Sequence, residues 1–197
     1  MKKFLIVVDT QYDFVIPGGA LYVSSAEEII TPGIQFLAGL DPEDYAGVLF
    51  TADTHLVETY YTTPESEQFP IHCVRDTAGW QNVFNPDLVH PSIPILHLEK
   101  GVFSMWEEKG LLAQAPRRWD IYKNIYRDAV FKDLQEQGVT TVQVMGVASD
   151  YCVKWAVDGL VQRGFDVEVI QDLCRGIGQP ANEVFLGVAE YEKVKLI

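Results

Sequence analysis

The chain has 197 residues, 48% of them hydrophobic, and carries a formal net charge of −13 at pH 7. A chain of this size can bury one sizeable core, so we expect a single domain spanning residues 1–197. The negative charge disfavours nucleic acid or an anionic membrane surface as a partner. Three cysteines without paired spacing indicate a reducing compartment rather than a disulfide framework. We therefore expect a cytoplasmic protein.

The N-terminal apolar run, Phe4–Val8, follows two lysines and so resembles the start of a signal peptide. It ends at Asp9, however, and no small-residue cleavage site follows, which favours a buried first strand. No apolar run in the chain approaches the length that spans a membrane. Asp9 then stands at the carboxyl end of this strand, before the loop at Pro17-Gly18-Gly19.

Further segments alternate between short apolar runs, typical of strands, and runs with helical periodicity. Strands are predicted over Gly47–Thr51, Pro94–Leu98, Thr140–Val144, Asp166–Ile170 and Lys193–Ile197. Helices are predicted after Ser25 (kinked or late because of Pro32), partly over Ser104–Ala115, over Ala129–Gln137, from Val153 towards Gly164, and from about Ala181 to Tyr191. This alternation predicts an α/β fold, a doubly wound, six-stranded, mostly parallel sheet with helices on both faces.

Cys152 follows the predicted strand Thr140–Val144 and falls in the first turn of the next helix, with Ser149 or Asp150 as a plausible N-cap. The unpaired amide groups and the positive dipole end of a helix N-terminus favour an anion such as a thiolate. Most free cysteines are instead small buried residues. Taken alone, Cys152 does not decide between these two interpretations.

The residues at the other strand ends favour the reactive interpretation, because ligand sites of doubly wound sheets lie outside the carboxyl ends of the strands. The residues at those ends are Asp9, Asp53 with His55, Lys100, Cys152 and Asp172. Charged groups at strand ends are often only solvated, but here a thiol, an amine and carboxylates come together. Lys100 and the helix N-terminus would lower the thiol pKa from about 8.5, and Asp9 would take the proton. Amide groups of the turn before the helix would hold a developing oxyanion.

A second group of residues suits a metal ion. Asp53 and His55 lie at positions i and i+2, on one side of an extended segment, and His72 lies in the long loop that follows. A carboxylate and two imidazoles suit a divalent transition metal with open coordination positions. The alternative is that the histidines are ordinary buried residues, which is our interpretation of His97, and a loop position is our interpretation of His90.

Several motifs, in this order along the chain, resemble the isochorismatase-like cysteine hydrolases and, within that family, the nicotinamidases. These motifs are Val8–Phe14, Asp53-Thr54-His55, Phe69–Cys73, Lys100-Gly101 and Gly146–Val153. The resemblance implies a catalytic triad of Asp9, Lys100 and Cys152. It also implies a cis peptide between Val147 and Ala148 that directs the amides of Ala148 and Cys152 at the oxyanion.

The resemblance further implies that Asp53, His55 and His72 bind a divalent transition metal, for which zinc is expected, with iron and manganese as alternatives. It implies that Phe14 packs on the ring of the substrate. Two residues depart from the family pattern: Phe69 stands where many nicotinamidases have Trp, and Ser149 where many members have Thr. The change at Phe69 affects the expected substrate-binding pocket, and neither change removes a reactive group.

Three functions are consistent with these features. The first is hydrolysis of nicotinamide to nicotinate and ammonia through a cysteine thioester, which the metal-binding motif favours because isochorismatases and carbamoyl-amide hydrolases of the family generally lack it. The second is hydrolysis of another small amide or of isochorismate. The third is a non-enzymatic binding module, which the complete triad disfavours. We expect a small-molecule substrate and a homo-oligomer.

Overall fold

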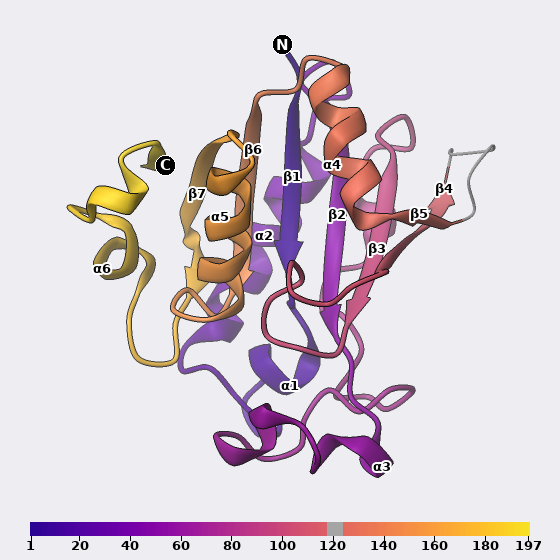
Figure 1. Cartoon of the computed structure of the whole chain (residues 1–197), viewed down its shortest axis with the longest axis vertical. Coiled ribbons are helices and arrows are strands. Elements are labelled where there is room, and N and C mark those ends of the chain that lie inside the picture. The colour runs from indigo at the N-terminus through magenta and orange to yellow at the C-terminus, as the bar shows by residue number, and fades with distance from the viewer. Residues whose placement is uncertain (118–123) are drawn as a thin grey trace.

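Six neighbouring strands of one sheet are parallel, as the alternating sequence pattern predicted. The computed structural model describes residues 1–117 and 124–197 and is shown in Figure 1. The strand order is β5-β4-β3-β2-β1-β6-β7-β8. The strands are β1 (Lys3–Val8), β2 (Tyr45–Asp53), β3 (Ile95–Lys100), β4 (Leu112–Arg117), β5 (Asn124–Tyr126), β6 (Thr141–Val147), β7 (Asp166–Arg175) and β8 (Val194–Leu196).

Within the described residues the sheet thus has eight strands, so the predicted number of six was wrong. The two additional strands, β4 and β5, pair antiparallel at the β3 edge. The helix expected over part of Ser104–Ala115 is also absent there, because residues 103–110 form turns and β4 begins at Leu112. Trp106 of this segment instead contacts the helix that contains Trp155: its Nε1 donates a hydrogen bond of 3.0 Å to the carbonyl of Trp155.

Helices cover both faces of the sheet (Figure 1). One core, on the face of α4 and α5, contains Phe131 and Val157, and the other, on the face of α1 and α2, contains Phe14 and Leu37. The α-helices are α1 (Tyr12–Val15), α2 (Ile30–Ala38), α3 (Val57–Tyr60), α4 (Arg127–Glu136), α5 (Cys152–Gln162) and α6 (Ala181–Phe185). Four short 3₁₀ helices complete the described elements: η1 (Ala26–Ile29), η2 (Pro64–Glu67), η3 (Pro86–Leu88) and η4 (Ala189–Tyr191).

One helix begins late, which was one of the two alternatives predicted from Pro32, and another ends earlier than predicted. Ser25 forms no side-chain cap and has a φ of 60°, so α2 begins later, at Ile30, and Pro32 falls in its first turn, where proline is tolerated. The helix predicted from Ala181 to Tyr191 ends at Phe185, because Gly187 adopts a φ of 75° that a helix cannot continue through.

The strand order places the candidate site. The parallel strands run in the order β3-β2-β1-β6-β7-β8, so the chain changes direction between β1 and β6. Ligands of doubly wound sheets bind at such a switch point, outside the carboxyl ends of the two strands. Asp9 follows β1, and Cys152 lies five residues after the end of β6.

Among the described helices, none combines the length and the apolar character that a membrane span requires.

Candidate active site and metal centre

Asp9, Lys100 and Cys152 meet at the carboxyl end of the sheet. Nζ of Lys100, the last residue of β3, lies 2.9 Å from Oδ2 of Asp9 and 3.7 Å from Sγ of Cys152. Thr51 donates a hydrogen bond of 2.6 Å to the other oxygen of Asp9. All four residues are buried. The three groups that the sequence analysis proposed as a triad are therefore in contact.

The electrostatics of this group differ from the sequence expectation in one respect. Burial raises the pKa of the Cys152 thiol well above its usual range, and this effect outweighs the neighbouring Lys100 ammonium, which lowers it. Although burial opposes it, the carboxylates of Asp53 and Asp9 raise the pKa of Lys100. The arrangement is therefore a neutral thiol and a charged ammonium beside a carboxylate that can take the thiol proton.

The turn between β6 and α5 presents Cys152. The peptide bond between Val147 and Ala148 is cis, as the resemblance implied. The carbonyl of Ala148 accepts hydrogen bonds from the amides of Tyr151 (3.0 Å) and Val153 (3.1 Å), which fixes the turn. The N-cap of α5 is Tyr151 and no side chain caps it, so the prediction of Ser149 or Asp150 as N-cap was wrong.

One predicted member of the strand-end group lies elsewhere. Strand β7 continues to Arg175, so Asp172 lies within the strand rather than at its end, and its side chain is exposed. The two remaining histidines also lie outside the site, as predicted: His97 stacks on Phe50 with ring centroids 5.5 Å apart, and His90 is exposed.

A second cluster joins the first through Asp53. Oδ1 of Asp53 lies 3.3 Å from Nζ of Lys100, whereas Oδ2 lies 3.2 Å from Nε2 of both His55 and His72. Glu65 completes this cluster, with carboxylate oxygens 3.6 Å from Nε2 of His55 and 3.4 Å from Nε2 of His72. One ligand atom from each of the four buried residues lies within 4.8 Å of the others.

Glu65 was not predicted from the sequence. It lies in the one-turn helix η2 together with Glu67, and nothing in the local pattern shows which of the two carboxylates turns inward. The structure shows that Glu65 is buried and Glu67 is exposed. Only the tertiary placement of the long loop after β2 distinguishes them.

The orientation of His72 suits a metal ligand. Its Nδ1 lies 2.8 Å from the carbonyl of Pro70, which can only accept a hydrogen bond, so Nδ1 carries the proton and Nε2 faces the cluster. The hydroxyl of Tyr60 holds the same segment by donating to the carbonyls of Phe69 and Pro70, both at 3.0 Å. Although burial opposes it, hydrogen bonds with Asp53 and Glu65 raise the pKa of His72 to about 9.

The residues present fit a divalent transition metal. Oε2 of Glu65 has no hydrogen-bond partner within the described part of the chain. With neutral imidazoles, the two linked clusters contain three buried carboxylates, of Asp9, Asp53 and Glu65, but a single ammonium. Buried charge requires compensation, and a dication bound by oxygen and nitrogen ligands would supply it, replacing the proton of His72.

Two polar residues of the segment after β1 hold this cluster and were not singled out in the sequence. The side chain of Gln11 exchanges two hydrogen bonds with the backbone of Asp53, at 2.8 and 2.7 Å, and is fully buried. Oδ2 of Asp13 accepts a hydrogen bond of 2.7 Å from the amide of Cys73, the neighbour of His72. Polar residues after a strand do not show in the sequence whether their side chains will form hydrogen bonds with the backbone of other elements.

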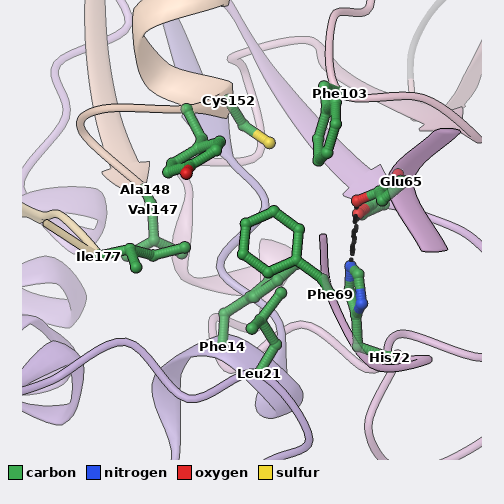
Figure 2. A pocket seen from close by; sticks show the side chains of 12 residues that line it. Phe14, Leu21, Glu65, Phe69, His72, Phe103, Val147, Ala148, Cys152 and Ile177 are labelled. Carbon is green, nitrogen blue, oxygen red and sulfur yellow. Dashed lines mark hydrogen bonds and ion pairs between the residues drawn. The ribbon is translucent and has the colours of Figure 1, made fainter. Parts of the chain in front are cut away.

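The two clusters face one small pocket, whose empty space, including its opening to solvent, is about 310 Å³. Figure 2 shows Cys152 and Ala148 on one side of it and Glu65 with His72 on the other. Apolar and aromatic side chains form most of the remaining wall: Phe14, Leu21, Phe69, Phe103, Val147, Tyr151 and Ile177. Phe14 and Phe69 thus both line the pocket, where the resemblance implied a site for a ring.

Comparison with known proteins identifies the family. The sequence profile of the Isochorismatase domain matches residues 3–192. The chain belongs to the isochorismatase family. The resemblance seen in the sequence motifs is confirmed, as is the α/β fold predicted from the alternation of strands and helices.

Proteins named nicotinamidase or pyrazinamidase align over most of the chain. A nicotinamidase/pyrazinamidase of Mycobacterium tuberculosis is 28% identical, covering 99% of this chain and 98% of that protein. A nicotinamidase of Escherichia coli is 30% identical, covering 89% and 84% of the two chains. A pyrazinamidase of Pyrococcus horikoshii, solved in complex with zinc, has a TM-score of 0.71 and 26% identity, and the comparison covers 100% of this chain and 99% of that one.

Proposed function

We propose that the protein is a nicotinamidase, which hydrolyses nicotinamide to nicotinate and ammonia through a thioester on Cys152. The observation that carries this proposal is the pocket: the Cys152 thiol, with the Lys100 ammonium and the Asp9 carboxylate behind it, faces a carboxylate–imidazole cluster across a small aromatic-lined space. A carboxamide on a flat ring can occupy such a pocket with its carbonyl carbon at Cys152 and its ring among the aromatic side chains. The named relatives support the same substrate.

The first half of the proposed reaction is transfer of the acyl group to sulfur. Sγ of Cys152 attacks the carboxamide carbon as the thiol proton passes to the carboxylate of Asp9. The negative charge then lies on the oxyanion, which the amides of Ala148 and Cys152 stabilise with help from the ammonium of Lys100. When the C–N bond breaks, Asp9 returns the proton to the amine, and ammonia leaves.

The second half is hydrolysis of the thioester. Asp9, again a carboxylate, accepts a proton from a water molecule that attacks the acyl carbon. The C–S bond breaks, the sulfur regains a proton from Asp9, and nicotinate leaves. One carboxylate thus acts as base and then acid in each half, which its contacts with both Lys100 and Thr51 permit without rearrangement.

Asp53, His55, Glu65 and His72 would hold the metal ion, for which we propose zinc, with iron or manganese as alternatives. When bound, the metal would supply a Lewis acid for a water molecule or for a ring nitrogen of the substrate. The support for this set is the burial of all four residues and the Nε2 of His72, which faces the other three side chains. The Pyrococcus horikoshii relative, solved in complex with zinc, is consistent with the same metal.

The pocket disfavours isochorismate as the substrate. Among the described residues that line it, none is lysine or arginine, and Asp53 and Glu65 contribute negative charge. Isochorismate carries two carboxylates, which would need cationic partners when buried. A neutral amide has no such requirement.

Ammonia release from nicotinamide and benzamide, and pyruvate release from isochorismate, each before and after treatment with a chelator, test the proposed function. We expect turnover of nicotinamide only, with activity lost on metal removal and restored by zinc, iron or manganese. Benzamide, which lacks the ring nitrogen, should be a poor substrate under both conditions. Protein that is free of metal, gains none on incubation and still hydrolyses nicotinamide at the full rate would contradict the proposed metal centre. Turnover of isochorismate instead would contradict the proposed substrate.

Replacing Lys100 with alanine is expected to slow alkylation of Cys152 by iodoacetamide near neutral pH. The Lys100 ammonium, 3.7 Å from the sulfur, lowers the pKa of Cys152, so its removal reduces the thiolate fraction further. Mass spectrometry of the Cys152 peptide measures the rate. Lys154→Ala is the matched control, because Lys154 lies on the same helix but pairs with Asp158 at 2.8 Å. Equal rates in the wild type and Lys100→Ala would show that Lys100 does not activate the thiol.

A further inference from the structure

The carboxylate of Asp150, two residues before the proposed nucleophile, is bound by the loop after β7. It accepts hydrogen bonds from three consecutive amides: Ile177 at 2.9 Å, Gly178 at 2.7 Å and Gln179 at 3.0 Å. Hydrogen bonds from amides to a charged acceptor are stronger than those between neutral groups. The triad and the metal cluster do not use this carboxylate, although it belongs to the motif that carries Cys152.

The loop is shaped around this carboxylate. A Cβ atom at Gly176 would lie 3.1 Å from Oδ1 of Asp150 and 1.9 Å from the carbonyl oxygen of Gln179, and one at Gly178 would lie 3.3 Å from Oδ2 of Asp150. A side chain at Gly176 would therefore prevent the loop from closing on the carboxylate. The amide of Ser149 also donates to the carbonyl of Arg175, at 2.8 Å, so the Cys152 turn is joined to the segment after β7 at Ser149 as well as at Asp150.

The same loop brings an apolar side chain to the pocket. Ile177 lines the pocket beside Val147 and Ala148 (Figure 2), yet it is 41% exposed. A half-exposed side chain on a short loop lacks the packing that holds core residues in place. The backbone hydrogen bonds to Asp150 are therefore the contacts that fix where this wall of the pocket stands.

We propose that Asp150 is a positioning residue for substrate binding: it holds Ile177 against the pocket and so sets the affinity for an apolar ring. Asp150 does not cap α5, whose N-cap is Tyr151, and its two oxygens are engaged by the loop. The identity of the substrate rests on the proposed function. The mechanical link between Asp150 and Ile177 does not.

A double-mutant cycle with Asp150→Ala and Ile177→Ala tests the link. Each single change is expected to raise KM for nicotinamide by about tenfold, the effect of losing one apolar pocket contact, with kcat much less affected. Because Asp150 acts through Ile177, the double variant should bind no worse than Ile177→Ala alone. Asp172→Ala, an exposed carboxylate in β7, is the matched control and should leave KM unchanged.

Alkylation of Cys152 by iodoacetamide gives a second readout that needs no substrate. Loss of Ile177 from the pocket wall should speed alkylation of Cys152 in Asp150→Ala and in Ile177→Ala. The double variant should react no faster than Ile177→Ala alone. Asp150→Asn keeps one acceptor oxygen, so its alkylation rate should lie between those of the wild type and Asp150→Ala. If Asp150→Ala does not fold, Asp150→Asn takes its place in the test.

Additive effects of the two changes on KM and on the alkylation rate would overturn the proposal. A loss confined to kcat would also overturn it, because Asp150 would then act on the Cys152 turn. Unchanged values in Asp150→Ala would overturn it too. If the wild type does not hydrolyse nicotinamide, the proposed function fails, but the alkylation cycle still tests the link between Asp150 and Ile177.

Discussion

Cys152→Ala is expected to lower kcat for nicotinamide by about 10⁴-fold or more, because removal of a covalent nucleophile disables the whole catalytic unit. Cys152 is buried at the start of α5, and alanine keeps the backbone and most of the packing, so the fold should survive. The metal content should also survive, because the sulfur is not part of the carboxylate–imidazole cluster. Steady-state ammonia release, metal analysis and far-ultraviolet circular dichroism measure the three properties.

Cys174→Ala is the matched control for this variant. Cys174 is also a buried free cysteine, but it lies within β7 and does not line the pocket. We expect near-normal turnover in Cys174→Ala. A thioester on Cys152 should be trapped from wild-type protein by rapid acid quenching and seen by mass spectrometry as an added acyl group. Turnover near the wild-type rate in Cys152→Ala would end the covalent mechanism.

Asp9→Asn should lower kcat by about 10³-fold or more, within the upper range that general acid–base groups supply. The amide keeps the shape of the side chain but cannot accept the thiol proton or return it to the leaving amine. The hydrogen bond from Thr51 to Oδ1, at 2.6 Å, can persist, so we expect the variant to fold. Lys100 retains Asp53 as a partner at 3.3 Å.

Two measurements separate loss of the base from general damage in Asp9→Asn. Its metal content should match the wild type, since Asp9 is not among the four candidate ligands. Asp166→Asn, at the start of β7 and at the opposite end of the sheet, should retain full activity. Asp9→Asn that keeps kcat within tenfold of the wild type would assign the proton transfer to another group.

The sequence contains most of the site because the reactive residues are tied to strand ends. Asp9, Asp53 and Lys100 each stand at or next to the last residue of an apolar strand, and parallel strands bring their carboxyl ends to one edge. Alternating strands and helices were enough to predict that edge. Asp172 shows the limit of the argument, because β7 continues past the apolar run that marked its predicted end.

The remaining features depend on long-range contacts that no local pattern encodes. Glu65, Gln11 and Asp150 act through partners on other elements, and nothing in their immediate neighbours identifies those partners. The antiparallel strands β4 and β5 form at the sheet edge, where the apolar residues of Ser104–Ala115 have a spacing that resembles that of a helix. The pKa of Cys152 depends on how deeply the thiol is buried, which position in a helix does not show. The homo-oligomer and the single domain stay predictions.

The order of the strands has a consequence for how the protein matures during synthesis. Asp9 and Cys152 come together only when β1 pairs with β6, which sets Phe4 beside Val142. β1 can pair with β2 much earlier, but β6 leaves the ribosome on the order of ten seconds after β1 at ordinary rates of translation. The four candidate metal ligands all lie within residues 53–72 and precede β6. Cys152 is therefore the last reactive group to reach the site, and a growing chain cannot hydrolyse substrate before its central long-range pairing is complete.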